Sequence, residues 1–164
     1  MVRFCPLGLM ALLFLPLCLY AQMAEPSLAA DLDRLLEQEA VSWGEAARFI
    51  LAASDRGAGL SEERAFAAAL EMAGRPGLPK NAAAAGPANL GGVSLLMMKA
   101  FNMKSGLYRF FPTAHYAHRE LKYRGIIRGR SDPHIRVSGE RLLQILGLVL
   151  DYTGADPETG DRHE

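Results

Sequence analysis

Apolar residues recur every three or four positions through several segments of the chain, and turns rich in glycine and proline separate these segments. This period is that of an amphipathic α-helix, and no segment alternates strictly as a half-buried strand would. The pattern predicts six helices: Ser27 to about Ala40, from Ser42, Ser61 to Gly74, about Gly92 to Met103, Thr113 to before Gly125, and Ser138 to Gly154. We therefore expect an all-α fold.

Several of these helices begin at residues that cap well. Ser42 is followed three positions later by Glu45, which predicts a capping box. Ser61, Thr113 and Ser138 also stand where a hydroxyl can accept a hydrogen bond from a helix N-terminus. The apolar positions that we expect to face the core are Ala46, Phe49, Ile50 and Ala53 in the second helix, Phe66, Ala69 and Leu70 in the third, and Leu95, Leu96 and Phe101 in the fourth.

The helices follow one another in a repeating order. The end of the third helix (Leu70, Ala73, Gly74) matches the end of the fifth (Leu121, Arg124, Gly125) at an offset of 51 residues. The helices that follow match at 47, and Val41-Ser42 stands to the second helix as Val137-Ser138 stands to the sixth. The chain therefore reads as two helix-loop-helix units preceded by a half unit. We expect residues 22–153 to pack as one compact helical domain.

Residues 1–21 have the pattern of a secretory signal peptide: an early arginine, an apolar run and a small residue, Ala21, after which we expect cleavage. Two prolines interrupt the run, so we do not expect a transmembrane span. A lipoprotein site at Cys18 is the less favoured alternative, because Leu17 stands where a small residue is normal. We expect an exported protein, located in the periplasm or in the cell wall at the cell surface.

The two cysteines of the chain, Cys5 and Cys18, both lie in this segment. The processed chain would therefore contain no thiol, which excludes disulfides, thiolate zinc sites and cysteine nucleophiles. At the other end, residues 154–164 are acidic and rich in glycine and proline, and we expect them to be disordered.

Charge is distributed unevenly although the net charge is zero. From Lys104 to Arg141 there are nine Lys and Arg against three Asp and Glu, whereas the stretch from Glu25 to Glu71 and the C-terminal tail are acidic. Such a basic segment indicates either an anionic partner or an acidic surface elsewhere on the same molecule.

Residues 111–146 resemble an S-layer homology repeat. The shared features are His115-Tyr116-Ala117 near a helix start, Gly125-Ile126-Ile127-Arg128-Gly129 in the loop, and Val137-Ser138 before the last helix. The resemblance is fainter in residues 41–51 and 62–103. It implies a fold of short helix-loop-helix repeats, with grooves between the repeats that bind peptidoglycan or secondary cell-wall polysaccharide.

The sequence departs from the family pattern at several positions. Tyr116 stands where the family usually has tryptophan, and Trp43 and Gly139 stand where it usually has arginine. In the middle unit, Ala65 takes the aromatic position.

Within the resemblance, we expect six residues to bind the ligand: Tyr116, Arg128, Gly129, Arg130, Arg136 and Ser138. Gly125 can end its helix in a left-handed conformation, so that Arg128 and Arg130 project from the turn that follows. The helix start at Ser138 presents backbone N–H groups beside them. The same residues also have purely structural roles open to them, as a helix stop, a cap and packing contacts.

Other chemistries find less support. His115 and His118 have a spacing that two zinc ligands can use, but no third ligand has an evident place. No nucleophile motif or identifiable carboxylate pair occurs, so we expect neither an enzyme nor a cofactor. Export argues against nucleic acid. We expect a non-enzymatic envelope protein that binds peptidoglycan or an anionic wall polymer. The alternative is a scaffold with a vestigial ligand site, whose basic segment docks an acidic envelope protein.

Overall fold

A computed structural model describes residues 28–74 and 77–155. The expected signal peptide and nearly all of the expected acidic tail lie outside the described residues. By its contacts the chain divides into an N-terminal part that ends at Arg34 and a main part that begins at Leu35. All contacts discussed below belong to the main part, and the word unit is kept for the helix-loop-helix repeats.

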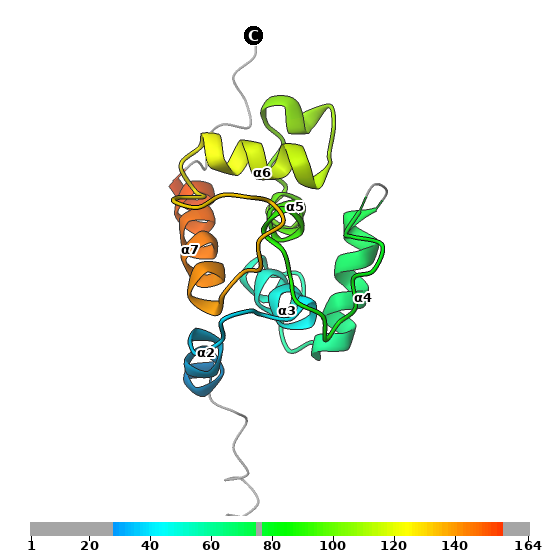
Figure 1. The fold of residues 1–164 in the computed structure, drawn as a ribbon, viewed down its shortest axis with the longest axis vertical. Coiled ribbons are helices and arrows are strands. Elements are labelled where there is room, and N and C mark those ends of the chain that lie inside the picture. Colours follow the sequence, from blue (N-terminus) through cyan, green and yellow to red (C-terminus); the bar gives the residue numbers. More distant parts are fainter. Residues whose placement is uncertain (1–27, 75–76, 156–164) are drawn as a thin grey trace, which may run out of the picture. The chain divides into compact units, whose positions relative to one another are not determined.

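The described residues form α-helices joined by loops, as Figure 1 shows. They are α2 (Leu28–Leu36), α3 (Trp43–Ala53), α4 (Glu62–Ala73), α5 (Leu90–Ala100), α6 (Ala114–Tyr123) and α7 (Gly139–Ala155), with a short 3₁₀ helix, η2 (Gly106–Arg109). In these residues β structure is limited to two isolated bridges, Ser42 to Pro87 and Asn89 to Arg136. The expected all-α fold is confirmed. None of the described helices is long and apolar enough to cross a bilayer.

Three buried residues of the main part of the chain form a closed ring of backbone hydrogen bonds. Val41 donates to the carbonyl of Val137 at 2.8 Å, Val137 to that of Ala88 at 3.1 Å, and Ala88 to that of Val41 at 2.9 Å. All three residues are fully buried. Each stands one residue before the N-cap of α3, α5 or α7. The three helix starts are therefore structurally equivalent, in agreement with the repeat that the sequence indicates.

Most of the predicted helix starts are confirmed. Ser42 and Glu45 form the expected capping box, and the hydroxyls of Ser61 and Thr113 accept from the backbone three residues on. The start predicted near Gly92 is wrong: α5 begins at Leu90, because the Asn89 side chain caps it with a 2.8 Å bond from the Gly92 N–H. The first helix ends at Leu36 and not near Ala40.

Loop carbonyls also pair with the N–H groups at the starts of α3, α5 and α7. The loop before α5 accepts from the first two residues of α3, and the loop before α7 accepts from the first two residues of α5. These bonds are Trp43 to Gly86 (2.9 Å), Gly44 to Ala84 (2.9 Å), Leu90 to Ile135 (3.0 Å) and Gly91 to Pro133 (2.8 Å). At α7, Gly139 donates instead to the carbonyl of Gln38 at 3.0 Å. Consecutive units are thus joined through their helix starts.

The inner face of α4 differs from the prediction. Ala65, Ala69 and Ala73 are buried, whereas Phe66 is only half-buried and Leu70 is 44% exposed. A stripe of small side chains lets two helices approach closely, and α4 packs against α3 and α5. The expected inward position of Leu70 is therefore wrong, while that of Ala69 is confirmed.

The repeat offsets change accordingly. The capping residues Ser61 and Thr113 are 52 positions apart (113 − 61), whereas Gly74 and Gly125, which end α4 and α6 with a positive φ, are 51 apart (125 − 74), as expected. Asn89 and Ser138 are 49 apart (138 − 89), and not 47 as expected for the helices that follow. Buried Ala65 then matches buried Ala117. The counterpart of Tyr116 is Arg64, so the assignment of Ala65 to the aromatic position is wrong.

Candidate functional site

The loop after α6 folds as the sequence indicates. Gly125 adopts a positive φ of 72°, and Ile126 and Ile127 are buried, 4% and 3% exposed. Both isoleucine N–H groups donate to the carbonyl of Leu121, which closes the end of α6. This turn is anchored in the core and presents the residues that follow it at the surface.

Arg128, Gly129 and Arg130 lie exposed beyond that turn. The Arg128 side chain folds back, its Nε donating to the carbonyl of Gly125 at 3.0 Å. The guanidinium of Arg141, on α7, donates to the carbonyls of Arg128 and Arg130. The loop is therefore held by a third arginine that sequence reasoning did not assign a role.

Tyr116 lies away from this loop. It is half-buried in the first turn of α6 and packs against Phe111 and His115, with ring centroids 5.6 Å and 5.3 Å away. Gly125 follows the opposite end of α6, and the helix from Tyr116 to Tyr123 alone spans about 10 Å. The structure therefore separates the aromatic residue from the arginines along the helix.

Arg136 and Ser138 lie just before the first residue of α7. The Ser138 hydroxyl accepts from the backbone N–H of Arg141 at 3.3 Å, and the N–H of Gly139 donates to the carbonyl of Gln38. These groups are therefore already paired within the fold. Arg136 is exposed and lines a groove of about 550 Å³ with Gln38, Ala40, Ser42, Glu45, Ala85 and Pro87. We call this the Arg136 groove. Neither Tyr116 nor Arg128 is in its wall.

The positions where the resemblance leads one to expect arginine serve packing. Trp43 is 2% exposed, and the carbonyl of Leu35 fills the space that a side chain on Gly139 would need. Leu90, the equivalent first residue of α5, is fully buried. All three equivalent positions are therefore part of the core or of a close backbone contact, and none can present a cation.

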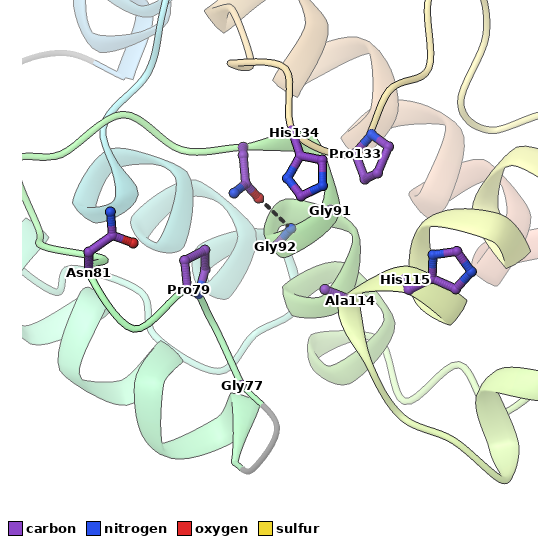
Figure 2. A pocket seen from close by; sticks show the side chains of 10 residues that line it. Gly77, Pro79, Asn81, Gly91, Gly92, Ala114, His115, Pro133 and His134 are labelled. Atoms are coloured by element: carbon purple, nitrogen blue, oxygen red, sulfur yellow. Dashed lines mark hydrogen bonds between the residues drawn. The ribbon is translucent and has the colours of Figure 1, made fainter.

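A second groove, of about 540 Å³, lies between the units at the N-termini of α5 and α6. We call it the His134 groove. Figure 2 shows Pro79 and Asn81 on one side, Ala114 and His115 on the other, and His134 above Gly92. The remaining lining residues are Gly77, Asn89, Gly91 and Pro133. Four separate segments of the chain, spread from residue 77 to residue 134, thus form one concave surface.

The His134 groove combines a wall of glycine, proline and alanine with four polar side chains, and none of the described lining residues is acidic. Asn81 and Asn89 supply amides, and His115 and His134 supply exposed imidazoles. The side-chain oxygen of Asn89 accepts a hydrogen bond from the Gly92 N–H, so the NH₂ group of Asn89 is the part that can donate to a ligand. The Asp132 carboxylate accepts from the backbone N–H of His134 at 2.8 Å, which fixes the loop that carries this histidine. Such groups suit hydroxyl, amide and anionic oxygen atoms.

Sequence reasoning missed this groove. Sequence reasoning considers His115 in the family motif and, with His118, as a metal pair, and it assigns no role to His134. The structure places His115 at the surface and His118 in the core, 5% exposed. Among the described residues, no three His, Cys, Asp or Glu side chains gather as metal ligands would.

No family model, curated protein or solved structure matches this chain.

Proposed function

We propose that this protein is an exported, non-enzymatic envelope component that binds peptidoglycan or an associated wall polymer through the His134 groove. The observation that carries the proposal is the groove itself, placed between repeat units and lined by two amides and two imidazoles. The resemblance of residues 111–146 to an S-layer homology repeat supports this class of ligand.

The size and the wall of the groove favour binding of a polymer segment. Its volume of about 540 Å³ lies within the range of ordinary ligand sites. Amide and imidazole groups can pair with the hydroxyl and acetamido groups of a glycan, and their N–H groups can donate to phosphate or carboxylate oxygens. We propose that these amides and imidazoles bind the ligand by hydrogen bonds.

The proposal differs from the expectation based on sequence in where the ligand lies. Tyr116, Arg128, Gly129 and Arg130 are not in the walls of the His134 groove, and Arg136 and Ser138 lie at the neighbouring helix start. We therefore propose that Asn81, Asn89, His115 and His134 contact the ligand directly.

Co-sedimentation with purified sacculi tests the proposal. The chain from Gln22 to Glu164 is mixed with sacculi, with and without attached polymers, at two salt concentrations. We expect pelleting by the wild type and a clear loss in Asn81→Ala/His134→Ala, while Arg128→Ala/Arg130→Ala, which leaves the groove intact, still pellets. Loss only in the arginine variant would move the site to the loop.

A second candidate function is docking of an acidic envelope protein. It is favoured by one observation: Arg128 and Arg130 are exposed on a loop that Arg141 holds in place, outside both grooves. If the wild type stays in the supernatant with every preparation of sacculi, wall binding is excluded and this second function becomes the one to pursue.

A further inference from the structure

The segment between α5 and α6 exposes large apolar side chains. Leu107 is 52%, Phe110 72% and Phe111 55% exposed. They belong to one short stretch around η2, which projects beyond α6 in Figure 1. We call residues 104–112 the aromatic loop. Three exposed large apolar side chains in so short a stretch mark a surface that meets an apolar partner.

Basic side chains accompany the aromatic loop. Lys99, Lys104 and Arg109 line a cavity of about 230 Å³ against it, together with Met98, Asn102, Met103, Tyr108 and Pro112. The sequence contains no Asp or Glu from Lys99 to Arg119. The acid that follows, Glu120, accepts from the Ser105 hydroxyl and from Arg124 Nε, both at 2.9 Å. The surface of the aromatic loop is therefore both apolar and cationic.

The aromatic loop is held in one shape before any partner arrives. The Phe110 and Phe111 N–H groups both donate to the carbonyl of Leu107, at 3.2 and 3.0 Å. Gly106 has a positive φ of 52° and lies against the Glu120 carboxylate, where a Cβ would not fit. Binding through the loop therefore costs little ordering entropy.

We propose that the aromatic loop docks on the surface of an anionic lipid bilayer. Leu107, Phe110 and Phe111 enter the headgroup region, and Lys104 and Arg109 meet lipid phosphates. A projecting loop with apolar side chains and cations beside them has the composition of an interfacial anchor. This inference goes beyond the proposed function and uses no residue of the His134 groove, so either can fail without the other.

Flotation with vesicles tests the proposal. The chain from Gln22 to Glu164 is mixed with vesicles of phosphatidylcholine alone, or of phosphatidylcholine with phosphatidylglycerol. We expect binding to the mixed vesicles that weakens with salt. Phe110→Ser/Phe111→Ser should reduce the partition coefficient about tenfold or more. Lys104→Ala/Arg109→Ala should reduce it about fivefold for each cation removed, on the anionic vesicles only.

Two matched variants separate the aromatic loop from general surface properties. Leu70→Ser/Tyr123→Ser removes exposed apolar side chains elsewhere, 44% and 89% exposed in the wild type, and should leave binding unchanged. Arg128→Ala/Arg130→Ala removes the same charge from another loop and should have a smaller effect than Lys104→Ala/Arg109→Ala. Equal losses in the two charge variants would overturn the proposal, because they would indicate attraction by net charge alone.

A fluorescent reporter gives an independent measurement. Trp43 is the single tryptophan and is buried, so its emission stays constant, whereas Phe110→Trp should shift to the blue on mixed vesicles. Absence of flotation with both vesicle types would overturn the proposal. So would concentration-dependent self-association in ultracentrifugation that Phe110→Ser/Phe111→Ser abolishes, since the loop would then cover a second copy of the chain.

Discussion

The ring of Trp43 on α3 occupies the space that a Cβ on Gly92 of α5 would need. Trp43 is 2% exposed, and its neighbour Gly92 is also buried in the first turn of its helix. This contact joins the starts of two repeat units. It gives Gly92 a packing role that is independent of any ligand in the His134 groove.

Gly92→Ala should therefore lower the free energy of unfolding by about 1–3 kcal/mol, through overpacking against Trp43. Urea denaturation followed by Trp43 fluorescence measures it. Gly147→Ala is the matched control, because Gly147 lies on α7 with open space around its Cα. That variant should be slightly more stable than the wild type, by roughly 0.5–1 kcal/mol. Equal stability of the two alanine variants would contradict the packing account.

Gly139→Arg, which restores the residue that the S-layer homology pattern leads one to expect, should destabilise the protein and not create a binding site. The Leu35 carbonyl lies where the new Cβ would go, and the Gly139 N–H is bonded to Gln38. We expect a loss of about 1–3 kcal/mol or more in unfolding free energy. A thermal melt beside the wild type measures the loss. An unchanged melting temperature would show that the Leu35 segment yields at small cost.

Ser42→Ala should cost more stability than Ser61→Ala. At Ser42 the hydroxyl accepts from the Glu45 N–H at 3.1 Å, and the Glu45 carboxylate in turn accepts from Ser42 and from Gln38. Ser61 accepts a single exposed bond of 3.5 Å. We expect about 1–2 kcal/mol for the first substitution and about 0.5 kcal/mol for the second. Denaturant midpoints measured on both variants would reveal a reversed order.

Arg141→Met should release the loop that carries Arg128 and Arg130. The substitution keeps the aliphatic stem and removes two hydrogen bonds to the loop carbonyls. Because these bonds are exposed, we expect a global loss of only about 1 kcal/mol. Amide exchange in residues 128–131 should nevertheless accelerate well beyond that of α6. Unchanged exchange would mean that the loop is ordered by its backbone alone.

Acid should destabilise the protein through His118. Burial, then the charge of Lys122, lowers the pKa of His118 below its ordinary value of 6.5, against the opposing effect of a hydrogen bond with the Ser131 backbone. His115 lowers it further, and Asp132 raises it. Its Nε2 atom is buried and has no hydrogen-bond partner in the described chain.

The unfolded chain therefore takes up this proton more readily than the folded one. The free energy of unfolding should fall as the pH drops below 6.5 and level off below the folded-state pKa. Urea midpoints across this range, for the wild type and His118→Gln, measure the effect. The variant should lose less stability on acidification, and parallel curves would assign the pH dependence to other groups.

Local chemistry was enough to predict several features. Ser42, Ser61 and Thr113 cap their helices because a cap depends on a few consecutive residues. The turn at Gly125 and the burial of Ile126 and Ile127 followed from the same kind of reasoning. Each of these features depends on residues that lie within a few positions of one another in the sequence.

The face of α4 and the site could not be read in this way. In α4, alanine and larger apolar residues occur on several sides, and close approach to α3 selects Ala69 over Leu70. The His134 groove joins residues from 77 to 134, so only the packing of the units brings Asn81 and His134 together. The Asn89 cap was the one local signal that could have shown where α5 begins.

The ring of Val41, Ala88 and Val137 also governs when the chain can become stable during its synthesis. Val41 is made long before Val137, and until the latter appears one of the three bonds can form, while the Val41 N–H and the Ala88 carbonyl wait for their ring partner. A buried peptide group without a partner is costly, so an incomplete chain cannot hold the native core. The three helix starts therefore acquire their full set of hydrogen bonds only after the segment that carries Val137 has been synthesised.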